Sequence, residues 1–220
     1  MSKGLATGRF ITLEGGEGAG KSTLARALKE QAEALGLRVT LTREPGGSPR
    51  AEAIREVILS GGVRQHGPFV EALMFSAARI DHIDRLIRPA LERGDWVICD
   101  RFIDSTRAYQ GTLGKVDAAL LAELEAVTID GLLPDLTLIL DLDPAVGLAR
   151  AARRRAPDEA VDRFEGEALA FHRTLRQAYL DIAAAEPQRC VVLDGSLAPA
   201  ALAQSAWTAI RERLPVPQPA

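Results

Sequence analysis

The sequence is poor in cysteine and histidine, which limits the chemistry that the chain can support. Its 220 residues include two cysteines and three scattered histidines. Cys99 lies in the apolar run WVICD and Cys190 in RCVVLD, where a strand would bury them. We therefore interpret both as core thiols, with neither the pattern of a disulfide framework nor that of a metal site.

Long hydrophobic runs and an excess of positive charge are also missing. No apolar run approaches the roughly 18–20 residues of a membrane-spanning helix, and the first residues, MSKGLATGRF, lack the apolar core of a signal peptide. A formal net charge of -3 provides no global cationic field for a nucleic acid. We therefore expect a soluble, cytoplasmic protein with no membrane partner and no nucleic-acid partner.

The apolar content that is present is enough for one folded domain. Hydrophobic residues make up 47% of the chain, which allows a substantial core. We expect residues 1–213 to form a single α/β domain. Residues 214–220, which end in PVPQPA, should form a proline-rich tail that frays.

Five strand-length apolar runs alternate with longer helical patterns. The runs are rich in Val, Ile, Leu and Thr and span residues 9–15, 38–44, 96–101, 135–143 and 189–195. Helical patterns include residues 21–36 and 68–94, each ending at a glycine. This alternation predicts a doubly wound, five-stranded parallel sheet with helices on both faces. Ligands of such a sheet bind at the carboxyl ends of its strands.

One glycine-rich segment carries the strongest functional signal. Residues 15–22, GGEGAGKS, match G-x-x-x-x-G-K-[ST] between a predicted strand and a predicted helix, which indicates a fold of the P-loop NTPase type. Its backbone N–H groups can surround phosphate oxygens, while Lys21 bridges the β- and γ-phosphates and Ser22 ligates Mg²⁺. The expected nucleoside triphosphate site comprises Gly15, Gly16, Glu17, Gly18, Ala19, Gly20, Lys21, Ser22 and Thr23.

The glycine-rich segment at residues 15–22, called the phosphate cradle below, indicates a class of ligand but does not determine the reaction. The chain has no N-K-x-D sequence, which argues against a GTPase, and it is short for a motor ATPase. The variable cradle positions, residues 16–19, contain no arginine, although an added arginine is commonly the strongest contributor to phosphoryl transfer. A transferase would therefore need an arginine from another segment or another chain, and a kinase would also need an acceptor site.

Residues that could form an acceptor site follow two strands and lie on one helix. Arg43 in TREPGG and Arg101 in DRF can each bind a phosphate through two hydrogen bonds. Phe75 and Arg79 in FSAAR share a helix face, which offers a flat apolar surface beside a multi-donor cation for a planar base. The alternative is that Phe75 belongs to the core and Arg79 forms a surface ion pair.

Five motifs taken together resemble one enzyme family. They are ITLEGGEGAGKST, TREPGG, LMFSAAR, CDRFIDSTRAYQG and PDLTLILDLDPAVGLAR, and their order and spacing are similar to those of bacterial thymidylate kinases. The resemblance implies transfer of the γ-phosphoryl group of ATP to dTMP, with Mg²⁺ as cofactor, by a homodimer. The alternatives are another nucleoside monophosphate kinase and an ATP-binding regulatory module that transfers no phosphate.

The resemblance also implies roles for single residues. Glu17 would lie near the sugar hydroxyl of dTMP and the metal, Arg101 would hold the dTMP phosphate, and Asp100 would lie beside Mg²⁺. Phe75 would stack on thymine, and Arg79 would hydrogen-bond its carbonyl edge. The other expected dTMP contacts are Arg43, Pro45, Ser105, Thr106, Gln110 and Tyr109, which would pack under the deoxyribose where a 2′-hydroxyl would clash.

An arginine-rich segment could supply the cation that the cradle lacks. Residues 150–165, RAARRRAPDEAVDRFE, lie where the related kinases place a mobile lid, expected here at about residues 150–163. Charge runs of this kind are otherwise usually solvated helix faces. Arg153 is the first candidate for the catalytic cation and Arg155 the second, while Arg150 or Arg154 would flank adenine. The predicted catalytic residues are thus Lys21, Arg101, Arg153 and Glu17.

Several acidic positions keep two interpretations. Asp141 or Asp143 could help to hold the metal, or could cap the helix that follows them. The turn at residues 194–195 could face adenine, as the resemblance implies, or be an ordinary turn. Asp162 and Glu165 could contact the acceptor or the metal, or could form salt bridges.

Overall fold

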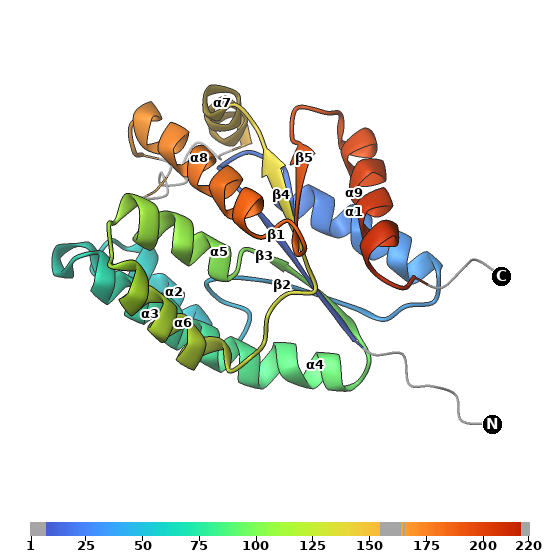
Figure 1. Cartoon of the computed structure of the whole chain (residues 1–220), viewed down its shortest axis with the longest axis horizontal. Helices are drawn as coiled ribbons and strands as arrows, with labels where there is room; N and C mark the ends of the chain where they lie inside the picture. The colour runs from blue at the N-terminus through green and yellow to red at the C-terminus, as the bar shows by residue number, and fades with distance from the viewer. Residues whose placement is uncertain (1–7, 155–163, 165, 217–220) are drawn as a thin grey trace.

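The computed structural model of the chain describes residues 8–154, 164 and 166–216. Within them, five parallel strands form one sheet in the order β2-β3-β1-β4-β5 (Figure 1). The strands are β1 (Arg9–Gly15), β2 (Val39–Arg43), β3 (Trp96–Asp100), β4 (Leu136–Asp141) and β5 (Cys190–Asp194). Each predicted apolar run contains one of these strands, so the predicted doubly wound sheet is confirmed.

Apolar side chains on both faces explain why these runs form central strands. Alternate residues of a strand point to opposite faces, so Ile11 and Leu13 join one core cluster whereas Phe10 joins another. The first cluster lies under α1 (Lys21–Ala34) and α9 (Pro199–Arg213), which cover one face of the sheet (Figure 1). The opposite face is covered by η2 (Ile83–Ile87), α4 (Arg88–Glu92), α5 (Ile103–Thr106), η3 (Arg107–Leu113) and α8 (Leu169–Ala185).

The remaining helices extend the second face and the carboxyl edge of the sheet. They are α2 (Pro49–Leu59), η1 (Arg64–His66), α3 (Pro68–His82), α6 (Ala118–Ile129) and α7 (Pro144–Arg154). Both α2 and α6 pack against α3, on the left of the view in Figure 1. Among the described residues, no helix is long and apolar enough to cross a membrane.

The helix predicted over residues 68–94 forms as one helical run with an irregular centre. It consists of α3, the π-helix η2 and α4. Pro89 lacks the N–H that a regular helix would use at this point, and the preceding amide, Arg88 N–H, donates to Ile83 O five residues earlier. Gly94, with φ 80°, follows the run as predicted.

Both cysteines are buried free thiols, as their apolar surroundings predicted. Burial raises the pKa of the Cys99 thiol well above its ordinary value and that of Cys190 to about 11. Neither thiol is therefore ionised near neutral pH, which matches a packing role.

The topology opens a crevice between two neighbouring strands. The chain leaves β1 into α1 on one face of the sheet and leaves β3 into α5 on the opposite face. The carboxyl ends of two strands whose connections diverge in this way are the usual ligand site of an open α/β sheet. The glycine-rich segment follows β1, and Arg101 follows β3, so both reach this crevice.

Candidate functional site

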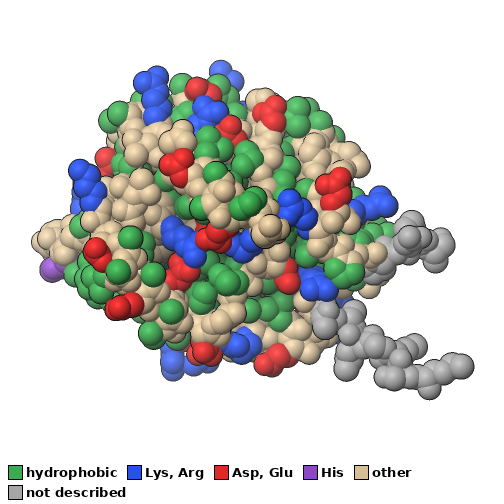
Figure 2. Space-filling view, viewed as in Figure 1, with side chains coloured by type: hydrophobic (Ala, Val, Ile, Leu, Met, Phe, Trp, Pro, Cys, Tyr) green, Lys and Arg blue, Asp and Glu red, His purple; other side chains and the backbone are tan. Residues whose placement is uncertain are grey.

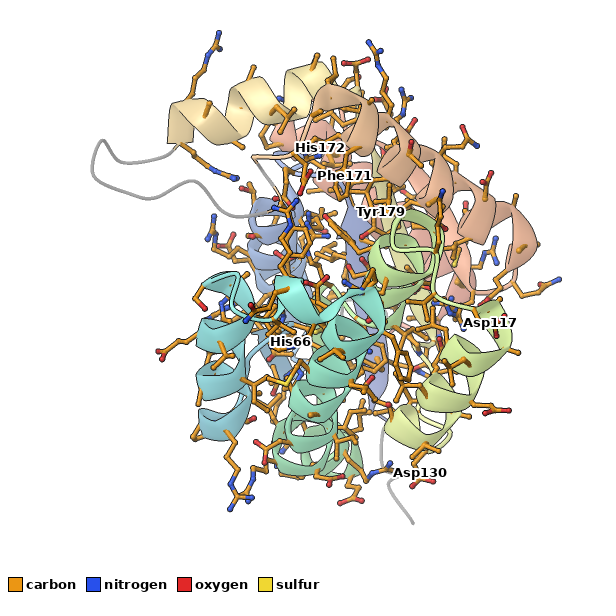
Figure 3. The ribbon with its side chains drawn as sticks, turned by 90° about the vertical axis from the view of Figure 1, so that its left-hand side faces the viewer. His66, Asp117, Asp130, Phe171, His172 and Tyr179 are labelled. Atoms are coloured by element: carbon orange, nitrogen blue, oxygen red, sulfur yellow. The ribbon has the colours of Figure 1, made fainter. Side chains whose placement is uncertain are left out.

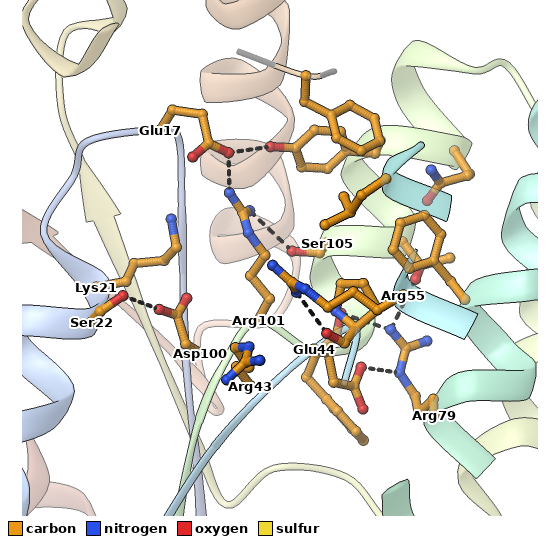
Figure 4. A pocket seen from close by; sticks show the side chains of 18 of the residues that line it. Glu17, Lys21, Ser22, Arg43, Glu44, Arg55, Arg79, Asp100, Arg101 and Ser105 are labelled. Carbon is orange, nitrogen blue, oxygen red and sulfur yellow. Dashed lines mark hydrogen bonds and ion pairs between the residues drawn. The ribbon is translucent and has the colours of Figure 1, made fainter. Parts of the chain in front are cut away.

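A cavity of about 240 Å³ lies at the carboxyl ends of β1, β2 and β3 (Figure 4). It joins residues that are widely separated in the sequence. The predicted residues that line it are Glu17, Gly18, Gly20, Lys21, Ser22, Arg43, Pro45, Phe75, Arg79, Asp100, Arg101, Ser105, Thr106, Tyr109, Gln110 and Arg154. The nucleotide motif and the expected acceptor residues therefore share one space.

Glycine is required by the backbone of the phosphate cradle. Gly15, Gly18 and Gly20 have φ values of 135°, 68° and 99°, a region that side-chain-bearing residues rarely adopt. A Cβ on Gly18 would also lie 2.0 Å from the carbonyl oxygen of Gly147 in α7. The loop is thus held closely against the segment that follows β4, and Gly16, Ala19 and Thr23 complete it without lining the main cavity.

Lys21 lies inside the loop that it belongs to. Its Nζ donates to Gly15 O and Gly16 O, each at 3.0 Å, and the residue is only 7% exposed. Burial and the neighbouring Arg101 lower the pKa of Lys21, whereas Glu17 and nearby acids oppose this shift. An ammonium group held by two carbonyl oxygens can exchange them for phosphate oxygens without moving far.

Two oxygen donors meet beside the lysine. The Ser22 hydroxyl at the start of α1 donates to Asp100 Oδ2 at the end of β3, at 2.7 Å. A hydroxyl and a carboxylate are hard ligands of the kind that Mg²⁺ takes, with substrate phosphates and water completing its shell. This pair therefore fits the predicted Mg²⁺ ligands.

Arg101 occupies a strained position at the bottom of the cavity. Its φ of 73° is rare for a residue with a side chain, and its amide donates to Leu13 O at 2.9 Å. Its guanidinium forms an ion pair with Glu17. Although burial opposes ionisation, Arg101 and Lys21 lower the pKa of the Glu17 carboxyl to about 2. The cation and the carboxylate of this pair are thus both charged at neutral pH.

Tyr109 forms the aromatic wall next to this pair. Its hydroxyl donates to Glu17 Oε1 at 3.4 Å, and its ring lies 5.4 Å from the Arg101 guanidinium carbon. The ring of Phe164 packs edge-on at 5.0 Å, although this residue had not been predicted to lie in the site. Tyr109 is 9% exposed, so its ring is a fixed surface, as steric selection of a sugar would require.

Arg79 is buried, so a surface ion pair is not its role. It is 3% exposed, and its Nε donates to Glu44 Oε2 at 2.7 Å. Its Nη2 donates to Phe102 O and to Thr106 Oγ1, both at 3.1 Å. Among the described residues, Nη1 is the nitrogen of this guanidinium for which no partner is found, and the side chain lines the cavity. One donor therefore remains for a ligand.

The other predicted base contacts surround this end of the cavity. Phe75 is half-buried and lines the cavity, so it is not a core residue. Gln110 is 2% exposed and donates to Glu71 Oε2 at 3.1 Å, and Ser105 and Thr106 lie one turn away on α5. A flat apolar ring and several polar groups thus face the same space as Arg79.

The end of β2 and the helix α2 supply two arginines to the cavity wall, one of which had not been predicted from the sequence. Arg43 is exposed and binds both carboxylate oxygens of Glu52 at 3.0 and 3.1 Å. Arg55 of α2 also lines the cavity and donates to Pro45 O at 2.7 Å. Arg55 has no motif of its own, and no pattern in the sequence indicated that it reaches the cavity.

The described lid arginines lie in different places. Arg154 lines the cavity, whereas Arg153 is exposed and does not. Arg150 Nη1 donates to Gly195 O at 3.0 Å, next to the turn that was expected to face adenine. Arg155, Asp162 and Glu165 lie outside the described residues, as does most of the segment predicted as the lid.

The structure separates the roles of two aspartates at the end of β4 and just after it. Asp141 binds the Arg176 guanidinium through both carboxylate oxygens, at 2.5 and 2.8 Å. Asp143 Oδ1 accepts from Ala145 N at 2.9 Å, which is the geometry of a helix cap. The capping alternative therefore holds for Asp143, and Asp141 is engaged by a cation.

Comparisons with known proteins agree with this geometry. Residues 13–206 match the family model described as thymidylate kinase. A thymidylate kinase of Nitrobacter hamburgensis is 56% identical over 211 residues, covering 96% of this chain and 91% of that protein. A thymidylate kinase of Rhodopseudomonas palustris is 57% identical over 208 residues, covering 94% and 90%. The crystal structure of the thymidylate kinase of Ehrlichia chaffeensis superposes with a TM-score of 0.74 at 31% identity, covering 92% of this chain and 98% of that one. The chain belongs to the thymidylate kinase family.

Proposed function

We propose that the protein transfers the γ-phosphoryl group of ATP to dTMP, giving ADP and dTDP for dTTP synthesis, with Mg²⁺ as cofactor. The observation that carries this proposal is that one cavity joins two distinct binding groups. Lys21 of the phosphate cradle lies at one end, and the buried Arg79 lies at the other beside Phe75. A triphosphate donor and a base-bearing acceptor can therefore meet within this space.

The donor phosphates would bind to residues 15–23. Backbone N–H groups of the loop and the Lys21 ammonium neutralise the phosphate oxygens. Ser22 and Asp100 would hold Mg²⁺, which would supply positive charge to neutralise the donor phosphates. The turn at residues 194–195, together with Arg150, would lie on the adenine side of the site.

The acceptor phosphate would bind to Arg101, with Arg43 and Arg55 on the neighbouring wall. Lys21, Arg101 and Glu17 would thus act at the reacting groups, with Glu17 near the sugar hydroxyl of dTMP. No general base is required, because the attacking atom is an oxygen of a phosphate that is already ionised. Catalysis in such a site consists of alignment and stabilisation of the transferred charge.

The base and sugar would occupy the opposite end of the cavity. The ring of Phe75 would stack on thymine, while Arg79 Nη1 would donate to a carbonyl oxygen of the base. Pro45, Ser105, Thr106 and Gln110 would border the base. The fixed ring of Tyr109 would pack against the deoxyribose, so a 2′-hydroxyl would lack space.

The missing arginine of the cradle would come from the lid at about residues 150–163. Arg153 remains the predicted catalytic cation, with Arg155 as its alternative. The position of Arg154 on the cavity wall supports a lid that approaches from the end of α7. Residues 1–213 would act as one kinase domain with this lid, and residues 214–220 as its tail.

The acceptor assignment is tested by ADP release with different monophosphates. The purified protein is assayed with ATP, Mg²⁺ and dTMP, dUMP, UMP, AMP or GMP, and dTMP should give the highest kcat/KM. Equal rates with AMP would refute the acceptor assignment. ATP binding without turnover on any monophosphate would instead indicate a regulatory module.

We also propose that the protein is a homodimer, with α3 and α6 at the interface. Leu73 and Ile80 lie seven residues apart on one face of α3, and each is 41% exposed. On the adjacent helix α6, Leu120 is 41% and Val127 76% exposed. Figure 2 shows apolar side chains on the surface over these helices. Exposed aliphatic residues gathered on two packed helices favour coverage by a second copy.

Sedimentation equilibrium tests this assembly. The wild-type protein should sediment as a dimer, and Val127→Glu should shift it to a monomer because a charge would be buried at the interface. The control is Val192→Glu in β5, since Val192 is also exposed, at 43%, and lies away from α3 and α6. A monomeric wild-type protein, or dissociation by both substitutions, would contradict the proposed interface.

A further inference from the structure

One buried acid interrupts the apolar pattern of β1. Glu14 is 0% exposed and directly precedes the phosphate cradle. Its Oε1 accepts from Phe102 N at 2.8 Å and Ser105 N at 3.2 Å, and its Oε2 accepts from Ser105 Oγ at 2.7 Å. A single carboxylate thus connects the cradle strand to the segment that carries Arg101.

These hydrogen bonds fix the backbone around Arg101. The amides of Phe102 and Ser105 lie at the start of α5, where Ser105 N also donates to Phe102 O at 3.2 Å. Glu14 accepts from both amides from another strand, as a capping side chain does within one chain segment. The left-handed φ of Arg101, just before these amides, is therefore held by the carboxylate.

The hydroxyl groups next to Glu14 also hold the Arg101 side chain. Tyr179 of α8 is fully buried, and its hydroxyl lies 3.0 Å from Ser105 Oγ and 3.1 Å from Arg101 Nη1. Figure 3 shows Tyr179 where α8 meets η3. Arg101 Nη1 also lies 3.3 Å from Ser105 Oγ. One chain of hydrogen-bonding contacts, called the hydroxyl chain below, therefore connects Glu14, Ser105, Tyr179 and Arg101.

The direction of the hydrogens along this chain depends on Glu14. An ionised carboxylate only accepts, so Ser105 donates to Glu14 and can accept from Tyr179. Tyr179 then presents a lone pair to the Arg101 guanidinium. A neutral Glu14 would donate to Ser105, which would donate to Tyr179, so the Tyr179 hydroxyl would lose Ser105 as its acceptor beside a guanidinium that can only donate. The ionised acid is thus the form that favours a held Arg101.

We propose that Glu14 and Tyr179 are positioning residues for Arg101: the ionised Glu14 orients the Ser105 and Tyr179 hydroxyls so that they hold the guanidinium for the acceptor phosphate. This inference rests on the proposed function, in which Arg101 binds the phosphate of dTMP. Neither residue contacts a substrate in this scheme. Both act through the placement of Arg101.

Burial and then neighbouring charges place the titration of Glu14 in an accessible pH range. The titratable groups that face it from the packed elements are Lys21 of α1, Cys99 of β3, Arg101 and Asp104 after β3, Tyr109 of η3 and Tyr179 of α8. Burial, and then the charge of Asp104, raises the pKa of Glu14 to about 7, although Arg101 and the hydrogen bonds from Ser105 and Phe102 oppose this shift. The orientation of the hydroxyl chain therefore changes with pH near neutrality.

Glu14→Gln tests the role of the charge. The glutamine oxygen can still accept from the two backbone amides, but its NH₂ group faces Ser105 as a donor and imitates the neutral acid. The kcat/KM for dTMP is measured for the wild type and the variant from pH 6 to 9. Ionisation of the dTMP phosphate affects both proteins equally, so it cancels in their ratio. We expect kcat/KM of the wild type to exceed that of Glu14→Gln by about tenfold at high pH, and this ratio should fall toward 1 at pH 6. A lost hydrogen bond to a charged group lowers kcat/KM by about tenfold.

Tyr179→Phe tests the same chain from its other end. The ring keeps its packing while the hydroxyl is lost, and kcat/KM for dTMP should fall several-fold at pH 8. In the Glu14→Gln/Tyr179→Phe double variant, the loss should not exceed that of the more severe single variant, because both changes affect one path. Thr128→Val is the matched control, since this buried residue donates to Leu124 O of its own helix at 2.6 Å, the one partner found for its hydroxyl among the described residues. Its kcat/KM should equal that of the wild type.

The outcomes separate this inference from the proposed function. A wild type that phosphorylates dTMP, with a ratio that does not change with pH, or with multiplicative losses in the double variant, would refute the inference alone. A wild type without turnover on dTMP would refute both. If Glu14→Gln does not fold, Tyr179→Phe decides, and a wild-type kcat/KM at pH 8 in that variant would overturn the positioning role.

Discussion

Replacing Glu44 with glutamine should reduce both the stability of the protein and its use of dTMP. The Glu44 carboxylate accepts from Arg79 Nε at 2.7 Å and from His82 Nδ1 at 3.0 Å. The side chains of Glu44, Arg79 and His82 are 4%, 3% and 0% exposed. Water therefore cannot replace the carboxylate when its charge is removed.

The size of the expected loss in the free energy of unfolding follows from this burial. Removal of one partner from a buried ion pair costs about 3–5 kcal/mol, because the remaining charge is left without compensation. Glutamine keeps one acceptor oxygen, so we expect a loss near the lower limit, about 3 kcal/mol in the free energy of unfolding. This is a large part of the roughly 5–15 kcal/mol that stabilises a typical domain. Urea denaturation measures it directly.

The same substitution should weaken recognition of the base. With Nε released, the Arg79 guanidinium can rotate away from its position on the cavity wall. The KM for dTMP should rise about tenfold or more, as expected for a hydrogen bond made by a charged group. The KM for ATP should stay close to that of the wild type, because the phosphate cradle is unchanged.

Two further variants serve as controls for Glu44→Gln. Glu33→Gln removes the acid of the exposed ion pair with Lys29 on α1, and such pairs contribute less than about 0.5 kcal/mol. The double variant Glu44→Met/Arg79→Met should recover much of the lost stability, since apolar replacements of a buried pair are tolerated, yet dTMP selectivity should not return. A Glu44→Gln protein as stable as the Glu33→Gln protein would refute the proposed importance of the buried pair.

Other predictions concern the reaction itself. Lys21→Ala and Arg101→Ala should each lower kcat by about 100-fold or more in the ADP-release assay, and near-wild-type rates in both would refute the site. Tyr109→Ala should raise kcat/KM for UMP relative to dTMP, whereas Tyr109→Phe, which keeps the ring, should preserve the preference. Single alanine substitutions at Arg150, Arg153 and Arg154 should show the largest loss of kcat at Arg153, and full activity in all three would argue against a catalytic arginine among them.

The fold could be predicted from the sequence because its strands are covered on both faces. The nearly continuous apolar stretch of residues 136–140 within the predicted run is buried throughout, so its composition alone indicates a central parallel strand. The phosphate cradle could be predicted for a similar reason. Its φ values at Gly15, Gly18 and Gly20 require glycine, so the glycines that this conformation needs can be recognised in the sequence.

The partners of the charged residues could not be predicted. Arg79 was expected on either a ligand face or the surface, and its burial depends on Glu44, which is 35 residues away in the sequence. Arg55 reaches the cavity only because α2 packs against α3. The irregular helix around Pro89 was likewise predicted as continuous, because a proline indicates a break but not the π-helical geometry that accommodates it.

Glutamates in or near the motifs explain how so many cations share one cavity. Glu17 pairs with Arg101, Glu44 with Arg79, and Glu52 with Arg43. Without substrates, unpaired arginines at this density would repel one another and lose solvation. A phosphate competes with a carboxylate for Arg101 and Arg43, whereas Arg79 keeps Glu44 on Nε and offers Nη1 to the base. The affinity of the first two arginines for phosphate therefore depends on the difference between two similar interactions. The sequence motifs indicate which arginines bind substrate. The acidic partners of these arginines hold the guanidinium groups in position and so determine which N–H groups are left for a ligand.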